Sequence, residues 1–325
     1  MEYSDEQIVF DLEQIKRNGI SDSNGLSFSA YKKTLKPKFS LVWRDIFLGY
    51  LALIGISAAL IIFQDRYAEL AIVYVIVGAL LIGYFQAYLN LFMHEAAHFN
   101  IHKDRELNDH LANWLICILT GQYIKNYRIV HWNHHKFLGT PKDSEHSYFE
   151  HLNWRFVLES LFGIKALKTI FGREKDEENQ NQQFDKAKFL QFLFLGALLN
   201  GIIVLVPFFF GFWHFSLAWV LGMVVFFPFF GALRQLLEHR DELAGPETDY
   251  SKTDHGKLSR MFRGPLNRTL GAAGFNRHLL HHWEPNISYT RLKELEGYLK
   301  DTQIGWVIEK NYSTYFRTFT RLFNS

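Results

Sequence analysis

Fifteen histidines occur in the 325-residue sequence, and most of them fall into short groups whose spacing could bind metal. The first group, H-E-x-x-H, places His94 and His98 one helical turn apart, with Glu95 beside them. Two further groups, "HWNHH" and "HLLHH", share the spacing H-x2-H-H and contain His131, His134, His135, His278, His281 and His282. Positions i, i+3 and i+4 of a helix lie on one face. Each group is therefore predicted to direct its imidazoles toward one metal site.

The H-E-x-x-H group alone also fits a zinc protease, in which the glutamate is the general base. Such a protease would need His94, His98 and one further ligand, and it would leave both H-x2-H-H groups without a role. We therefore favour one larger metal site, with Glu95 near the outer nitrogen of a histidine. A metal store or transporter is the third hypothesis. It predicts charged residues inside the apolar segments and no consumption of O2.

Long apolar segments must position these histidine groups. They cover residues 47–63, 70–93, 189–212 and 213–233. Each is close to the length of a membrane-spanning helix. The apolar character of the second is interrupted only by Gln86 and Asn90. A turn near Gly211 would join the last two segments as a hairpin. The sequence thus predicts an all-α integral membrane protein with four transmembrane helices, rather than a soluble protein with four buried helices.

The distribution of Lys and Arg predicts the orientation in the membrane. These residues are frequent in the N-terminal arm (1–45) and in the C-terminal tail (296–325). They are also frequent in the segment 94–188, which is part of a membrane domain that covers 46–295. The positive-inside rule places the arm, the segment and the tail in the cytoplasm. All three histidine groups, together with His239 just after the fourth span, then lie on the cytoplasmic side. We predict a helical cytoplasmic cap that carries a dimetal site.

These nine imidazoles exceed the needs of one ion, since a zinc site uses about four ligands. Two ions with four or five nitrogens each would use all nine. Imidazole suits iron, zinc and copper alike. A pair of redox-active irons would make sense beside lipid, where O2 and apolar substrates both concentrate. Of the other histidines, we expect His102, His146 and His255 at the surface and His214 at the opposite interface, with His102 the nearest to the first group.

Two counts narrow the classes of function. The single cysteine, Cys117, excludes a disulfide within the chain and leaves no ligand set for an iron–sulfur cluster. The formal net charge of +2 is too small to indicate binding to nucleic acid.

The histidine groups resemble those of the membrane fatty acid desaturase and hydroxylase superfamily. The resemblance covers roughly residues 45–295 and includes "HHKFLGTPKDSE", the pair Glu238-His239 and "NRHLLHHWEPNISYTRL". It implies a four-helix membrane anchor under a cytoplasmic cap that holds a di-iron centre. Such enzymes activate O2 with two external electrons and remove hydrogen from an unactivated C–H bond. The residues that match the iron ligands are His94, His98, His131, His134, His135, His239, His278, His281 and His282.

Other features of this resemblance concern the surroundings of the metal. Asn276 matches an asparagine that reaches the metal through water in acyl-CoA desaturases. The first group has three intervening residues where those enzymes have four, so it is more similar to acyl-lipid, bacterial or carotenoid-type members. We expect carboxylates to hold the outer ring nitrogens of the ligands. The candidates are Asp109, Asp143, Glu145 and Glu238, and also Glu95.

The expected function is that of an O2-dependent di-iron desaturase acting on a fatty acyl or lipid-like chain. A hydroxylase or ketolase of a lipid, a carotenoid or a small metabolite is the alternative for the same site. The sequence contains no fused cytochrome b5 domain, so the resemblance implies an external electron donor, either ferredoxin or cytochrome b5 with its reductase. A bacterial inner membrane or the endoplasmic reticulum is the expected location.

Overall fold

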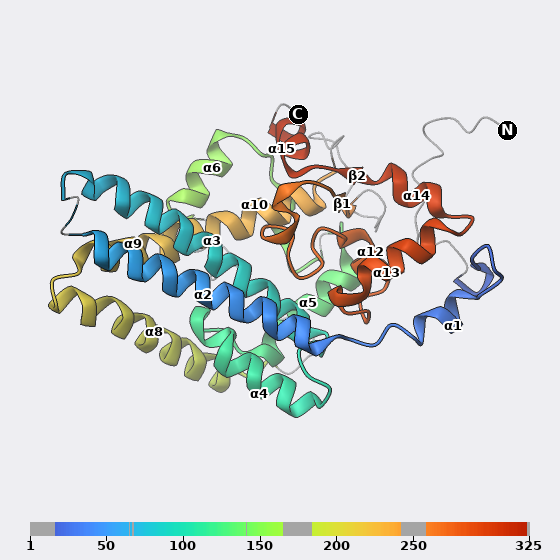
Figure 1. Ribbon diagram of the computed structural model, residues 1–325, viewed down its shortest axis with the longest axis horizontal. Helices are drawn as coiled ribbons and strands as arrows, with labels where there is room; N and C mark the ends of the chain where they lie inside the picture. The colour runs from blue at the N-terminus through green and yellow to red at the C-terminus, as the bar shows by residue number, and fades with distance from the viewer. Residues whose placement is uncertain are drawn as a thin grey trace. The chain divides into compact units, whose positions relative to one another are not determined.

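The computed structural model is mostly helical (Figure 1). It describes residues 17–64, 66, 68–140, 142–164, 184–241 and 258–323. Two short strands, β1 (Met261–Phe262) and β2 (Tyr312–Ser313), pair in parallel. The prediction of an all-α membrane protein is confirmed. The prediction for His255 lies outside the described residues, as does any for the side chain of His146.

The chain divides into two compact units, which are described separately. The spanning unit consists of Val42–His131 and Asn153–Arg234, and the C-terminal unit consists of Met1–Leu41, Trp132–Leu152 and Gln235–Ser325. Continuous helices run from one unit into the other. They include α2 (Phe39–Phe63), α5 (Ile124–Phe137) and α10 (Phe227–His239).

Four helices are long and apolar enough to cross a membrane. They are α2, α3 (Ala71–Ala97), α8 (Lys186–Phe209) and a fourth that runs from Trp213 to His239 as α9 (Trp213–Leu221), the π-helical turn η7 (Gly222–Phe226) and α10. The four predicted spans are therefore present, but their ends differ. The first helix begins eight residues before 47, and the ion pair between Arg44 and Asp45 lies within it. The fourth continues to His239, so that residue ends the helix instead of following it.

Large apolar side chains cover the outside of these helices. Phe47, Ile72 and Phe194 are 64%, 75% and 67% exposed, which suits contact with lipid. The most apolar stretch of α3 is 50% buried, whereas that of α8 is only 11% buried. Helix α3 is thus the most enclosed of the four, and it carries the first histidine group.

Small residues allow the spanning helices to approach one another closely. Gly49 of α2 packs on Tyr88 and Leu89 of α3, and Gly78 of α3 packs on Leu60 of α2. A Cβ at either glycine would lie 2.7 Å from a leucine methyl carbon. Such contacts are typical of helices in membranes, where van der Waals packing drives association.

Shorter helices complete the spanning unit. They are η4 (Ala68–Leu70), α4 (Arg105–Leu115), η5 (Cys117–Thr120) and α6 (Trp154–Leu161). Two of them begin at side-chain caps: Asp104 accepts a hydrogen bond from the Leu107 N–H at 2.8 Å, and Asn153 accepts one from the Phe156 N–H at 2.9 Å.

The C-terminal unit has its own hydrophobic core. Its helices are η3 (Arg17–Gly19), α1 (Phe28–Lys32), η6 (His146–Phe149), η8 (Pro265–Arg268), α12 (His278–Trp283), α13 (Tyr289–Lys300), α14 (Gly305–Lys310) and α15 (Tyr315–Phe323). The largest fully buried side chain of this core is Trp283, whose ring lies 5.0 Å from that of Phe28. The next residue, Glu284, forms ion pairs with Arg17 and Lys32. These contacts fix the short helix α12, which carries the third histidine group.

Candidate metal centre

Four buried histidines of the C-terminal unit form one compact group. It comprises His134 of α5, His239 of α10, and His278 and His282 of α12, each with a ring nitrogen within 4.8 Å of the others. The Nε2 atoms of His134 and His239 lie 3.2 Å apart, and those of His239 and His278 lie 2.8 Å apart. A further 3.2 Å separates Nε2 of His278 from Nε2 of His282. The Nε2 atoms thus converge on a common centre.

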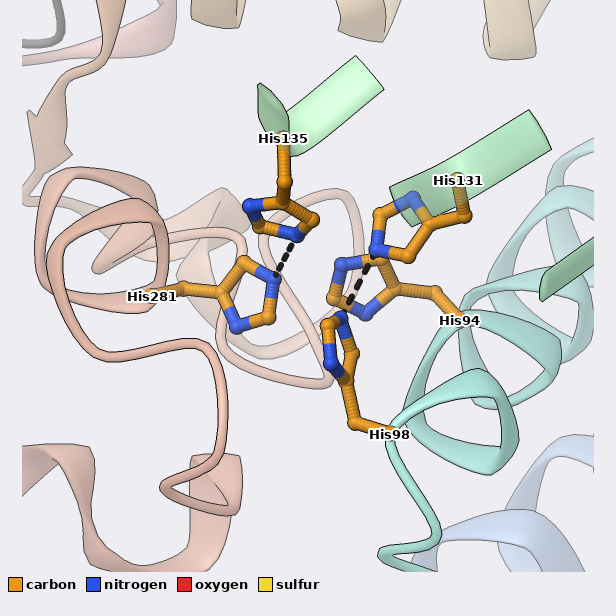
Figure 2. Close-up of side chains that lie close together, drawn as sticks. All are labelled: His94, His98, His131, His135 and His281. Atoms are coloured by element: carbon orange, nitrogen blue, oxygen red, sulfur yellow. Dashed lines mark hydrogen bonds between the residues drawn. The ribbon is translucent and has the colours of Figure 1, made fainter. Parts of the chain in front are cut away.

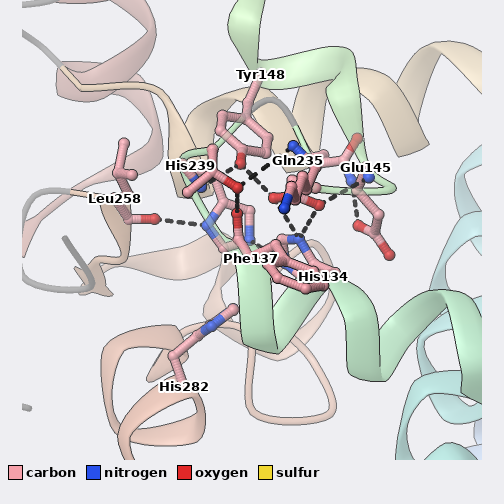
Figure 3. A network of polar contacts seen from close by, with 12 residues as sticks. His134, Phe137, Glu145, Tyr148, Gln235, His239, Leu258 and His282 are labelled. Carbon is pink, nitrogen blue, oxygen red and sulfur yellow. Dashed lines mark hydrogen bonds and ion pairs between the residues drawn. The ribbon is translucent and has the colours of Figure 1, made fainter. Parts of the chain in front are cut away.

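Two outer nitrogens of this group have acceptor partners (Figure 3). Nδ1 of His134 lies 3.0 Å from both carboxylate oxygens of Asp143, and Nδ1 of His239 contacts the main-chain carbonyl of Leu258. Because a carboxylate and a carbonyl only accept, each Nδ1 must carry the proton. In a neutral imidazole, Nε2 then presents its lone pair. Two lone pairs that face each other across 3.2 Å repel, and a shared cation removes that repulsion. The arrangement fits a metal ion.

The electrostatic surroundings of the group differ between its rings. Burial opposes protonation of His134, yet the carboxylates of Asp143 and Glu145 outweigh it and raise the pKa of His134 to about 9. Burial, together with the surrounding histidines, lowers the pKa of His282 well below its ordinary value. The carboxylates therefore favour positive charge at the His134 ring, from a proton or from a metal ion, while the His282 ring stays neutral and able to act as a ligand.

The carboxylate beside His134 is itself held in place. The hydroxyl of Tyr148 and the N–H of Glu145 both donate to Asp143, the latter at 2.8 Å. Burial and the nearby Asp143 raise the pKa of Tyr148, so its phenol stays protonated and remains a donor. The side chain of Glu145 accepts from Gln235 of α10. The predicted partner Asp143 therefore touches a histidine directly, whereas Glu145 acts on His134 through its charge.

The other four predicted ligands and partners in this unit, His135, His281, Glu238 and Asn276, vary in their contacts. The Nε2 atoms of His135 and His281 lie 3.0 Å apart. A carboxylate oxygen of Glu238 is 3.8 Å from Nε2 of His278, which is too long for a hydrogen bond. Asn276 is held through its main chain, because its N–H donates to Gly271 and its carbonyl accepts from Phe262. It lies two residues before the helix that carries the third histidine group.

The spanning unit brings together His94, His98 and His131 (Figure 2). Nε2 of His98 lies 2.8 Å from Nε2 of His131, and the rings of His94 and His131 are 4.3 Å apart. Glu95 is fully buried, with a carboxylate oxygen 3.7 Å from Nδ1 of His94. The same figure shows the contact between His135 and His281 in the C-terminal unit. Since His131 and His135 are one turn apart on α5, their side chains share a face of that helix.

The hypothesis that Asp109 holds a histidine is wrong. Its carboxylate forms an ion pair with Arg128, one of whose nitrogens lies 3.0 Å away. The guanidinium also donates to the carbonyls of Ala96 and Ala97 at the end of α3. A guanidinium is a stronger partner for a carboxylate than a neutral imidazole. Asp109 therefore acts on the chain just before His98 and not on a ligand ring.

Two histidines expected outside the site are indeed engaged elsewhere. His102 is half-buried, and its Nδ1 accepts a hydrogen bond from the N–H of Asp104 at 3.0 Å. His214 is buried at the start of α9, where its ring stacks on Trp213 at 3.8 Å. Neither belongs to the histidine groups described above.

Sequence reasoning missed two groups near the four histidines, Arg240 and the carbonyl of Leu258. Arg240 is buried beside His239, and it donates to the carbonyl of Phe149 at 2.9 Å and lies 3.0 Å from Nδ1 of His151. The carbonyl of Leu258 also went unnoticed, because a main-chain acceptor leaves no signal in the sequence. For Arg240, the sequence offered one indication, its position directly after the predicted ligand His239.

Comparison with known protein families identifies the chain. A family model described as fatty acid desaturase matches residues 70–318, well over half of the sequence. The chain belongs to the fatty acid desaturase family. The match begins later and ends later than the predicted 45–295. A comparison with curated proteins gave no match. Membership implies a lipid substrate and a membrane environment, and the histidine groups of this desaturase could hold metal, as expected for an oxidase of the desaturase or hydroxylase type.

Proposed function

We propose that this protein is an O2-dependent di-iron desaturase that introduces a double bond into a fatty acyl or lipid-like chain. The observation that carries the proposal is the convergence of four Nε2 atoms, two of them on rings whose Nδ1 faces an acceptor. Family membership supports the reaction class. In the balanced reaction, a –CH2–CH2– unit, O2, two electrons and two protons give a –CH=CH– unit and two molecules of water.

The nine histidines divide naturally between two irons. We assign four of them, His134, His239, His278 and His282, to one ion. The second ion would take the remaining five, which are His94, His98, His131, His135 and His281. The position of His131 and His135 on one face of α5 supports this second set. Imidazole ligands suit iron, although they also suit zinc and copper.

The other residues have supporting roles in this proposal. Asp143 and the carbonyl of Leu258 hold the protons at Nδ1 of His134 and His239, so that Nε2 of each ring is free to coordinate. Glu95, Glu145, Glu238 and Asn276 are assigned to the surroundings of the ligands. When bound, the iron pair would supply O2 activation and the abstraction of hydrogen. The buried setting of the histidines keeps bulk water away from that chemistry.

The electrons would come from a separate protein, either ferredoxin or cytochrome b5 with its reductase. We place both termini and the histidine groups in the cytoplasm, because Lys and Arg are concentrated in residues 1–45, 94–188 and 296–325. The positive-inside rule assigns segments rich in these residues to the cytoplasmic side. The membrane would be a bacterial inner membrane or the endoplasmic reticulum.

Metal analysis and lipid profiling test the proposal. Purified protein should contain about two irons per chain, since nine nitrogens exceed the needs of one ion. Lipids from cells that express the protein should include products lighter by two hydrogen atoms than those of cells with an empty vector. A gain of one oxygen atom would favour the hydroxylase alternative. One zinc per chain together with peptide hydrolysis would contradict the proposal.

A further inference from the structure

A buried amide lies inside the second spanning helix. Gln86 of α3 is 1% exposed, and neither its Nε2 nor its Oε1 has a hydrogen-bond partner among the residues that the structure describes. Within a membrane no bulk water can satisfy such a group, so burying it costs free energy. A buried polar group without a partner in a native structure calls for an explanation, and a bound ligand is one.

Helix periodicity gives the direction of this amide. Gln86 lies seven, four and three residues after Ala79, Ile82 and Gly83, so it shares their face of α3. That face packs against the π-helical turn η7 of the fourth span, where a Cβ added to Gly222 would lie 2.7 Å from Cγ2 of Ile82. Gly83 packs still more closely on Phe226, where an added Cβ would clash with Cβ of that residue. Gln86 therefore points toward the fourth span close to η7.

The fourth span is irregular at this point. The π-helical turn η7 interrupts an otherwise α-helical span. Turns of this kind are rare, and they occur frequently at functional sites. An unpartnered amide on one helix and a π-helical turn on its neighbour are independent observations, and both concern the same interface.

The amide of Gln86 also lies on the same side of α3 as His94, a proposed metal ligand. Gln86, Asn90 and His94 are separated by four residues each, so they form one ridge along α3. At a rise of 1.5 Å per residue, Gln86 is about 12 Å along the helix from His94. Asn90, between them, is half-buried. Two amide side chains thus lie on the face of α3 that carries His94, between the interior of the span and the first histidine group.

We propose that Gln86 binds a hydrogen-bonding group, a hydroxyl or a carbonyl, on the lipid-like chain that enters the spanning unit. This inference rests on the proposed function. A chain with such a group at about 12 Å from the carbon that is oxidised satisfies the amide, whereas a wholly apolar chain leaves it unsatisfied. Sites built to bond a polar group discriminate strongly against analogues that lack it. Gln86 thereby selects the substrate and sets its position along α3.

The test compares Gln86→Met with a matched control. Methionine has nearly the same length but lacks both amide atoms. Gln191→Met is the control, because Gln191 is an exposed glutamine of α8 whose side chain accepts from Lys188 at 3.1 Å. The probes are palmitate and its ω-hydroxy analogue. Binding is measured as the shift in Tm of the metal-free protein, and turnover is measured by mass spectrometry of the products.

The ω-hydroxy chain should raise the Tm of the wild type and of Gln191→Met more than palmitate does. Gln86→Met should lose this preference, and its ratio of turnover for the two chains should change by about tenfold or more in favour of palmitate. Its Tm without a probe should not fall, because the variant removes an unsatisfied polar group. A lowered Tm with an unchanged preference would mean that water or protein already satisfies the amide, and it would overturn the inference.

The two proposals can fail separately. Equal Tm shifts by both probes in the wild type would overturn the role of Gln86, even if the native lipids of expressing cells are oxidised. Native lipids identical to those of empty-vector cells would overturn the proposed function, whatever the Tm shifts are.

Discussion

The two units build their histidine sets in different ways. In the C-terminal unit, the four-histidine group draws on α5, α10 and α12, which are distant in the sequence, and acceptors such as Asp143 and the Leu258 carbonyl fix individual rings. In the spanning unit, His94 lies in the last turn of α3 and His98 is its C-cap residue, and the nearby carboxylate of Glu95 is 3.7 Å from Nδ1 of His94. The first set depends on tertiary hydrogen bonds. In the second, the end of one helix places His94 and His98, and His131 comes from α5.

The strongest test of this comparison removes one ligand from each set. His134→Ala and His98→Ala should both reduce turnover below detection, because loss of a ligand disrupts the geometry that O2 activation requires. Each variant should also retain less iron than the wild type, measured by elemental analysis. His102→Ala is the control, since His102 bonds to its own loop, and it should keep near-normal activity. Near-normal activity in either ligand variant would mean that the site has been assigned wrongly.

Asp143→Asn should have the next largest effect. The amide carries no negative charge, and only its oxygen can accept from Nδ1 of His134, so the ring is held less firmly and the positive charge at the site is less stabilised. Loss of such a partner typically lowers metal affinity or activity by about 10- to 100-fold. Iron affinity can be measured by competition with a chelator. An effect below threefold would show that the four-histidine group does not depend on this carboxylate.

Glu95→Gln should have a smaller effect than Asp143→Asn, because its carboxylate lies beyond hydrogen-bond distance of the His94 ring. We expect a decrease in turnover of less than about tenfold, below the lower end of the usual effect for groups that bond directly to a ligand. Steady-state turnover of the two variants side by side gives the comparison. Complete loss of activity in Glu95→Gln alone would instead favour the general base of a zinc protease.

Tyr148→Phe should have the smallest effect. It removes one hydrogen bond to Asp143 and the acceptor of the Gly139 N–H, but it leaves the carboxylate against His134. Loss of one such bond costs about 1 kcal/mol. Iron affinity should fall by about fivefold, and Tm should decrease slightly. A loss as large as that of Asp143→Asn would mean that the tyrosine, and not the helix packing, holds the carboxylate.

The parts of the molecule that could be predicted are those set by local sequence. Apolar runs predicted all four spans, and the spacing within each histidine group predicted which rings share a helical face. The ends of the spans were less predictable, because α2 continues through the charged pair Arg44 and Asp45. The apolar character of a segment predicts which residues prefer lipid, but it does not mark where the helix begins or ends. Those positions depend on the hydrogen bonds of the helix and on its caps.

Contacts between distant segments could not be predicted in the same way. Asp109 could pair with any nearby cation, and only the folded chain brings Arg128 to it. The same holds for the acceptor on His239, since the carbonyl of Leu258 is a main-chain group that any residue would supply. Asp143, which lies 3.0 Å from Nδ1 of His134, could be named as a candidate because it follows the second histidine group closely in the sequence.

The π-helical turn in the fourth span has a consequence for every residue after it. Such a turn contains one residue more than a regular α-helix would use, and each residue of an α-helix advances the side-chain direction by about 100°. The angular phase of α10 relative to α9 is thereby reset in the middle of the span. Deletion of a single residue in Gly222–Phe226 would let the turn close as regular α-helix and keep the direction of His239, whereas deletion of one residue within α10 itself would rotate His239 by about that angle, away from its three partner imidazoles, without changing any ligand.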